Sequence, residues 1–262
     1  MIEIAVTVAL IFTISLVFSM FGKGGGELYL PVMLSILNIA FYIAAGVSLF
    51  IIFLQSISMI FVYSKKHRLV DWKLALVLAS VVGGSSFIGG FFSEGVSAIY
   101  LKLTFSIFLI ISAIMLFLNK KMRVQESKFG IWHRRLGESE YNVNILYLVV
   151  TVGLVGFLAG MVGISGGGLI VPIAVMLGGV PLRIAMGTNT VLVLASSSMG
   201  FLGHATNGGV DWNLCALFGV AVIAGSQIGS RMHAKVGEKS LRIGLAVILT
   251  FAALWMIVRV LL

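Results

Sequence analysis

The sequence predicts an all-α polytopic membrane protein with two repeats of opposite membrane orientation, each made of a broken or re-entrant helical hairpin followed by three transmembrane helices. Three observations support this prediction: an apolar composition, a glycine cluster that occurs twice, and basic residues gathered in three segments. Of the 262 residues, 60% are hydrophobic and 10% are charged. Several apolar runs contain the roughly 20 residues that a helix needs to cross a bilayer.

A glycine cluster indicates that the chain contains a repeat. The segment GKGGGELYLP at residues 22–31 returns as GISGGGLIVP at residues 163–172. The similarity continues at the same offset and, after a slip of one residue, aligns Val70-Asp71-Trp72 with Val210-Asp211-Trp212. Agreement over several elements predicts a duplicated module. We therefore divide the chain into a first transmembrane repeat at residues 1–119, a linker at residues 120–144 and a second, inverted repeat at residues 145–262.

The basic residues predict which loops face the cytoplasm. Most of the 18 Lys and Arg lie within residues 65–73, 120–135 and 231–242, whereas residues 92–97 and 205–211 contain none. By the positive-inside rule the three basic segments are cytoplasmic and the other two connections are external. The linker 120–144 is then cytoplasmic and both termini are external. The net charge of +9 reflects topology in a cell membrane, so we expect the lipid bilayer, and no nucleic acid, as a partner.

Apolar runs between these loops predict six transmembrane helices, at residues 39–63, 72–92, 97–118, 183–204, 212–230 and 241–260. Each trio follows an apolar helix, at residues 2–20 or 145–162, then a glycine cluster and only about ten further residues before a break. Ten residues rise about 15 Å, which is half a membrane. We therefore expect two hairpins that each enter and leave on one side. The first segment carries Glu3 and no basic start, so we expect a retained helix rather than a signal peptide.

The tips of the two hairpins are the candidate binding site. An irregular backbone within a membrane must be buried in protein or line a water-filled cavity. A short helix is expected to begin just after each glycine cluster, with unpaired N–H groups and the positive end of its dipole at the tip. Such a tip suits an anion, and close packing through small residues is the alternative. The candidate glycines are Gly24, Gly25, Gly26, Gly166, Gly167 and Gly168.

Two charged residues belong to the first tip. Lys23 could hold an anion, pair with Glu27 four residues later, or lie at the cytoplasmic surface. Glu27 is a candidate for proton coupling, and capping or pairing is its alternative role.

Neutral polar residues near the tips could also bind an anion. Ser165 lies on the second tip, and Ser48, Thr188 and Asn189 lie early in the spans that follow the hairpins. Each of them could instead bond a neighbouring helix. Other polar residues lie further away: Gln55 is further along its span, and Asp71 and His204 fall near span ends, where we expect solvation.

Several motifs together resemble the TauE/SafE sulfite exporter family of membrane permeases. They are G-x-G-G-G-x-x-x-x-P at residues 22–31, its variant at residues 163–172, Ala-Met-Gly-Thr-Asn at residues 185–189 and Gly-Gly-Val-Asp-Trp at residues 208–212. The resemblance covers nearly the whole chain and implies transport of a small sulfur-containing anion such as sulfite, thiosulfate, a sulfonate or sulfoacetate. The chain departs from the family pattern at Lys23, Glu27, Ser165 and Asn189, which leaves the particular anion open.

The expected function is therefore that of a secondary transporter. The anion would lie at the membrane midplane between the two glycine-rich tips, and the repeats would move against each other to alternate access. A passive anion channel and a non-transporting scaffold or accessory subunit are the alternatives. The four histidines are scattered without metal-ligand spacing, so we expect no enzyme, metal or cofactor. The sequence leaves open whether the protein forms a homo-oligomer.

Overall fold

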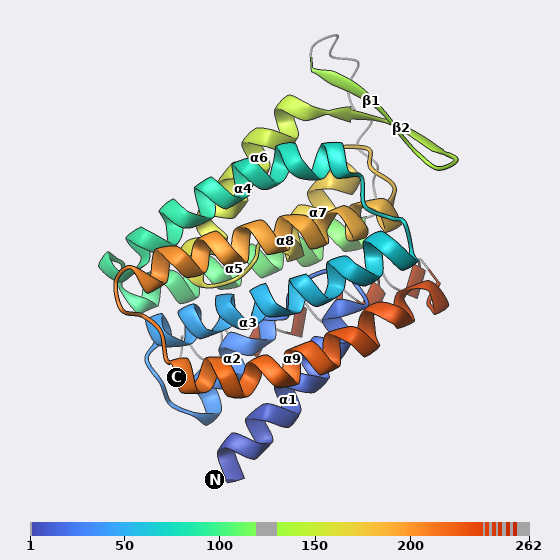
Figure 1. Cartoon of the computed structure of the whole chain (residues 1–262). Helices are drawn as coiled ribbons and strands as arrows, with labels where there is room; N and C mark the ends of the chain where they lie inside the picture. The colour runs from blue at the N-terminus through green and yellow to red at the C-terminus, as the bar shows by residue number, and fades with distance from the viewer. Residues whose placement is uncertain are drawn as a thin grey trace.

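The computed structural model describes residues 2–118 and 130–237, and scattered positions within residues 239–255. It is a bundle of helices with one small β-hairpin (Figure 1). Six of the described helices are long and apolar enough to cross a membrane, which agrees with the predicted polytopic class. The described helices are α1 Ile2–Ser19, α2 Gly26–Ile36, α3 Phe41–Phe61, α4 Trp72–Phe92, α5 Ala98–Leu118, α6 Ile145–Val162, α7 Gly167–Met176, α8 Leu182–Ala205 and α9 Trp212–Met232.

Short helical turns and two strands complete the described elements. A π-helical turn, Val62–Lys66, extends α3, and 3-10 turns follow α4 at Ser93–Gly95 and α9 at His233–Lys235. The expected helix at 241–260 lies mostly outside the described residues. The expected short helices after the glycine clusters are present, since α2 has 11 residues and α7 has 10.

The two halves have the same order of helices. In each half a long helix, a short helix and two long helices follow one another, as α1 to α4 and as α6 to α9. Corresponding helices run in opposite directions in Figure 1: α3 runs from left to right and α8 from right to left, and α4 and α9 are likewise opposed. Positive φ angles also recur at matching positions, at Gly22 and Gly163 and at Asn38 and Gly179.

The halves are interleaved rather than side by side. Helix α4 packs against α6 and α8 of the second half, and α9 packs against α1 and α3 of the first half. Glycines permit these close contacts. A Cβ at Gly89 of α4 would collide with the carbonyl of Phe157 on α6, and one at Gly229 of α9 would collide with the carbonyl of Leu16 on α1.

Polar residues at matching positions fix the helix ends. Asp71 and Asp211 each accept hydrogen bonds from backbone N–H groups in the first turn of α4 and α9, as N-cap residues do. Tyr63 donates its hydroxyl to the carbonyl of Ser19 at the end of α1, and the ring of His204 contacts the carbonyl of Gly160 near the end of α6. The expectation of a solvated His204 is wrong, because its side chain is fully buried and serves this contact.

A β-hairpin in the linker was not predicted from the sequence. Strand β1 (Ile131–Leu136) pairs antiparallel with β2 (Ser139–Asn144), and Gly137 adopts a positive φ in the tight turn between them. Asn144 ends β2 and caps α6, so the hairpin leads directly into the second half. Residues 119–129 of the linker lie outside the described part.

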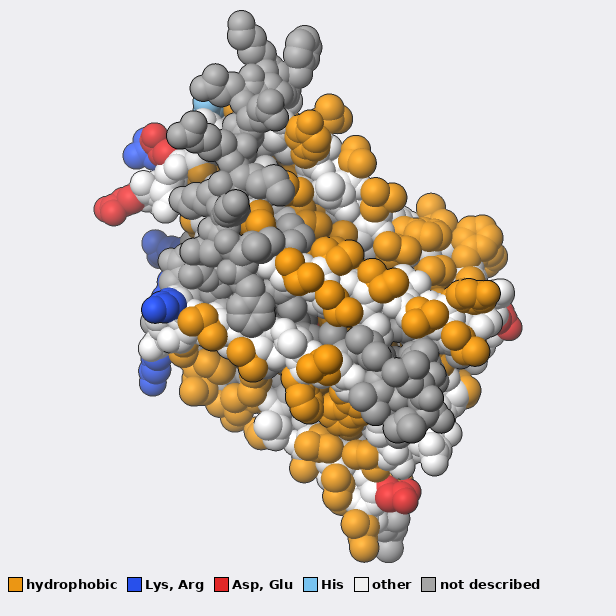
Figure 2. Space-filling view, turned by 180° about the vertical axis from the view of Figure 1, so that it is seen from behind, with side chains coloured by type: hydrophobic (Ala, Val, Ile, Leu, Met, Phe, Trp, Pro, Cys, Tyr) orange, Lys and Arg blue, Asp and Glu red, His pale blue; other side chains and the backbone are white. Residues whose placement is uncertain are grey.

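The described basic segments lie at one end of the bundle. The connection from α3 to α4, the β-hairpin and the end of α9 share this end, whereas the connections from α4 to α5 and from α8 to α9 lie at the opposite end (Figure 1). Figure 2 shows hydrophobic side chains over most of the visible face and Lys and Arg side chains along one edge. This grouping is what the charge pattern requires, and the compartment that each end faces stays a prediction.

Candidate functional site

Each hairpin tip rests on a long helix of the other half. Gly22 adopts a φ of 64°, and the space beside its Cα is filled by the carbonyl of Met186 on α8. Gly163 adopts a φ of 88°, and the same space is filled by the backbone of Ala45 on α3. Positions 45 and 186 correspond in the two halves. Only glycine meets both demands, since a side chain would be strained by φ and would collide with backbone.

The two tips also touch each other. A Cβ built on Gly24 would lie 3.2 Å from Oγ of Ser165, and one built on Gly167 would lie 3.2 Å from Cβ of Lys23. Gly26 in turn packs against Ile164. We call residues 22–26 and 163–167 together the tip crossing. The two glycine clusters, which the repeat predicts to form one site, lie together in the structure.

The short helices begin at the tip crossing without side-chain caps. Their N-cap residues are Gly25 for α2 and Gly166 for α7, and neither offers a capping side chain. The positive ends of both helix dipoles therefore lie at the crossing. Gly167 and Gly168 form the first turn of α7 and are buried. This arrangement favours a negative group at each helix start.

Lys23 and Glu27 form a buried ion pair at the first tip. Nζ of Lys23 lies 2.7 Å from Oε1 of Glu27, and both side chains have 0% exposure. Nζ also lies 4.9 Å from the ring centre of Phe18. Among the described residues neither charged group has a hydrogen-bond partner beyond this pair. Of the alternatives considered for Lys23, pairing with Glu27 is therefore present, and a position at the surface is absent.

Gln55 of α3 anchors the first tip, a role that its distance along the span did not suggest. Its Oε1 accepts hydrogen bonds from N of Gly25 at 3.3 Å and from the hydroxyl of Tyr29 at 2.9 Å. Its Nε2 donates to Oγ of Ser19 at 2.9 Å. All four residues are buried. The sequence signal for this role was an amide side chain within an otherwise apolar helix, because a buried amide needs hydrogen-bond partners.

Three neutral candidates are buried, and two of them, Ser165 and Asn189, lie in or beside the tip crossing. Nδ2 of Asn189 donates to the carbonyl of Gly22 at 2.9 Å, while its Oδ1 has no partner among the described residues. Oγ of Ser165 and Oγ of Ser48, which corresponds to Asn189 in the repeat, are likewise buried without a described partner. Buried polar atoms are nearly always hydrogen-bonded, so these three can serve a ligand.

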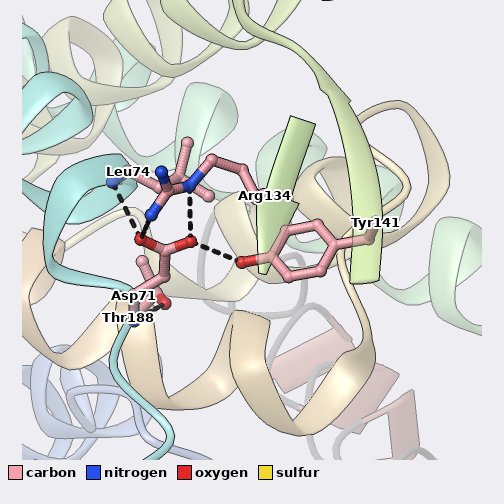
Figure 3. A network of polar contacts seen from close by, with 5 residues as sticks. All are labelled: Asp71, Leu74, Arg134, Tyr141 and Thr188. Atoms are coloured by element: carbon pink, nitrogen blue, oxygen red, sulfur yellow. Dashed lines mark hydrogen bonds and ion pairs between the residues drawn. The ribbon is translucent and has the colours of Figure 1, made fainter. Parts of the chain in front are cut away.

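Thr188 belongs to a different network, at the basic end of the bundle (Figure 3). Its Oγ1 accepts a hydrogen bond from N of Asp71 at 3.1 Å. The carboxylate of Asp71 is held by Arg134 and by the hydroxyl of Tyr141, both from the β-hairpin, and by N of Leu74. The expectation of a solvated Asp71 is wrong, since its side chain is only 1% exposed.

The electrostatics of Asp71 follow from these partners. Burial alone would raise the pKa of its carboxyl group, but hydrogen bonds from Arg134, Tyr141 and the N–H of Leu74 outweigh burial and lower it. The bond to Asp71 in turn raises the pKa of Arg134. The ion pair and hydrogen bonds at Asp71 thus connect the linker with α4 and α8. Thr188 is one of the residues that form this network.

A helical bundle of this hydrophobicity, with two broken hairpins whose short helices begin at a shared buried point, defines a multi-span membrane transporter. The chain belongs to the Sulfite exporter TauE/SafE family, whose model matches residues 7–256.

Curated relatives carry names of the same kind. The chain is 29% identical over 233 residues to the probable membrane transporter protein YunE of Bacillus subtilis, covering 84% of each chain. It is 29% identical over 261 residues to the probable membrane transporter protein MJ0441 of Methanocaldococcus jannaschii, covering 94% of this chain and 92% of the relative. A probable membrane transporter protein of Xylella fastidiosa matches 119 residues at 29% identity, 44% of this chain and 46% of the relative. No solved structure matches the chain.

Proposed function

We propose that this protein is a secondary transporter that carries a small sulfur-containing anion, such as sulfite, thiosulfate, a sulfonate or sulfoacetate, across the cell membrane by alternating access. The observation that carries the proposal is the tip crossing, where two helix starts, a buried lysine and the buried side chains of Ser165 and Asn189 meet. The family description supports a sulfur oxyanion as the substrate class.

The chemistry of the tip crossing fits such an anion. Lys23 supplies the positive charge, and the glycine N–H groups at the starts of α2 and α7 can approach sulfur-bound oxygens closely. Ser48 and Ser165 each supply a hydroxyl donor, and Asn189 supplies an amide next to Gly22. A tetrahedral group with three oxygens can accept from several such donors at once.

The relation between the halves supports alternating access. We infer that they form an inverted repeat with external termini and a cytoplasmic linker, because corresponding helices run in opposite directions and the described basic segments share one end. The reciprocal contacts of Gly22 with Met186 and of Gly163 with Ala45 give the halves a common pivot at the crossing. Small rotations about that pivot would open the site to one side at a time.

A passive channel fits the structure less well. Lys23, Glu27 and Ser165 are fully buried at the crossing, so the described residues leave no open water path through this point. A carrier passes through such a closed arrangement in each cycle, whereas an open pore does not.

Transport by purified protein in liposomes tests the proposal. We expect saturable uptake of at least one of sulfite, thiosulfate, methanesulfonate or sulfoacetate, and faster uptake when the same anion is present inside, since exchange is the mark of a carrier. Flux that grows linearly with concentration and shows no exchange would instead indicate a channel. The absence of flux for every anion in the panel would reject transport of this substrate class.

A further inference from the structure

The Lys23 and Glu27 pair is unusual because both ions are sealed within the described part of the bundle. Both side chains have 0% exposure, and no other Lys or Glu in the described residues is buried. A single unpaired charge in the interior of a membrane protein is energetically costly. Lys23 therefore needs one negative partner at all times, and Glu27 fills that position in this structure.

Glu27 also stands where an anion would bind. It lies in the first turn of α2, directly after the uncapped start at Gly25 and Gly26. The helix dipole favours a negative group there. Its carboxylate has no hydrogen-bond donor apart from Lys23, although the neighbouring tip presents the unpartnered hydroxyl of Ser165. A bound anion and this carboxylate would thus share the same positive group, Lys23.

We propose that Glu27 is an internal anion that the transported anion replaces at Lys23, so that each anion binds together with one proton taken up by Glu27. The inference rests on the proposed transport function. In the empty state, ionised Glu27 neutralises Lys23. On binding, one proton from solution adds to the Glu27 carboxylate, Lys23 keeps its charge, and its ammonium group turns to the anion.

For an anion that binds with a single negative charge, the exchange conserves charge at the centre of the membrane. A pair of Lys23 with ionised Glu27 becomes a pair of Lys23 with the anion, beside a neutral Glu27. A bound anion beside an ionised Glu27 would leave two negative groups for one lysine, and neutral Glu27 without an anion would leave the lysine unpaired. Both alternatives carry the cost of an uncompensated buried charge. Proton and anion therefore enter and leave together.

Other titratable groups lie near the first tip, but none of the described ones forms an ion pair with Lys23. Tyr29 on α2 donates its hydroxyl to Gln55 of α3. Tyr63 from α3 and His233 from the turn after α9 both contact the carbonyl of Met20 at the end of α1. The described neighbours from α7 and α8 are neutral, Gly167 and Asn189. Glu27 is the one carboxylate that the described residues place at Lys23.

Proton movement in liposomes tests the inference. The wild-type protein and Glu27→Gln are reconstituted with a pH-sensitive dye inside, and labelled uptake is measured with each anion that the wild type carries. We expect Glu27→Gln to carry one proton fewer per anion than the wild type, and its uptake to become more sensitive to membrane potential. Glu94→Gln, at an exposed glutamate in the turn after α4, is the matched control and should keep the wild-type ratio.

Binding gives an independent readout. If one proton enters with each anion, the anion concentration that half-saturates wild-type uptake should rise as the pH is raised, by up to about tenfold per pH unit, and in Glu27→Gln this dependence should disappear. An unchanged proton ratio and pH slope in folded Glu27→Gln would overturn the inference while leaving transport intact. If that variant does not fold, wild-type uptake without any accompanying proton overturns it. Absence of flux in the wild type is a separate result, and it rejects the underlying transport function.

Discussion

The guanidinium group of Arg134, in the β-hairpin, donates two hydrogen bonds to the carboxylate of Asp71 at the start of α4. Nε of Arg134 donates to Oδ2 of Asp71 at 2.8 Å, and its Nη2 pairs with Oδ1. The N–H of Asp71 is bonded to Thr188 on α8. The linker between the halves is therefore tied to one helix of each half at a single residue, with the carboxylate of Asp71 bonded to the linker and its N–H bonded to α8.

Loss of the ion pair between Arg134 and Asp71 should lower the free energy of unfolding. In Arg134→Gln, the carboxylate of Asp71 stays buried without its cation, and we expect a loss of about 2–3 kcal/mol in the free energy of unfolding. Thermal unfolding of the purified protein in detergent measures the loss. Arg135→Gln is the control, because Arg135 pairs with Glu140 on the surface, where the side chains are 74% and 72% exposed. That variant should change stability by less than about 1 kcal/mol, and equal effects of the two changes would contradict the assignment.

The same carboxylate predicts a dependence of stability on pH. The folded-state pKa of Asp71 lies below its ordinary value of 3.8. Its contribution to stability is therefore complete above that ordinary value and is lost as the pH falls through the folded-state pKa. Asp71→Asn should be less stable than the wild type at pH 6, and the difference should shrink as the pH falls below about 4. Thermal unfolding of both proteins from pH 3 to 7 measures this, and a constant difference would contradict it.

A side chain at Gly22 should prevent the tips from docking. Gly22→Ala combines a positive φ with a collision against the carbonyl of Met186, so we expect at least about 2 kcal/mol of destabilisation or loss of the folded protein. Gly84→Ala on α4 is the control, because no atom lies within 4 Å of the added Cβ. It should be neutral or slightly stabilising, since alanine favours helix. The yield of monodisperse protein in size-exclusion chromatography compares the two, and a normal yield for Gly22→Ala would refute the close approach.

Gln55→Leu should release the first tip. The change leaves N of Gly25, the hydroxyl of Tyr29 and Oγ of Ser19 without the partner they share, which should cost about 2–4 kcal/mol. Tyr29→Phe removes only the contact of the hydroxyl and should cost about 1 kcal/mol. Thermal unfolding should therefore rank wild type, Tyr29→Phe and Gln55→Leu in falling order. A Gln55→Leu protein as stable as Tyr29→Phe would show that Gln55 is not the anchor.

The helices of this fold were predictable because their signals are local. Long apolar runs, glycine clusters and the break at Gly178-Gly179-Val180-Pro181 delimit them without any knowledge of packing, and the described helix ends fall within a few residues of the expected ones. The β-hairpin was not predictable in the same way, because it lies in a short basic segment whose charge indicates a solvated linker. Exposed and less exposed side chains alternate only over the six residues of β1, and β2 does not alternate regularly.

The site was predictable in part. Repetition pointed to both glycine clusters, and the spacing of Lys23 and Glu27 allowed the ion pair, but nothing local decides whether a lysine pairs within its helix or faces a ligand. Gln55 and Thr188 depend on packing between distant segments. Gln55 meets the tip because α1, α2 and α3 lie together, and Thr188 bonds Asp71 because α8 starts beside α4. The spacing of residues along the sequence does not reveal such contacts between distant segments.

The reciprocal support of the tips has a consequence for how the protein is made. Gly22 and its neighbours leave the ribosome long before Met186 and α9, against which the first half packs. Until the second half has been synthesised, the segments that bury Lys23 and Glu27 are missing. The nascent first half then presents these polar groups to lipid. We expect a chain that stops after the linker to be cleared by membrane proteases, and co-expression of the missing half to rescue it. The first half should therefore be stable in the membrane only after the second half has been synthesised.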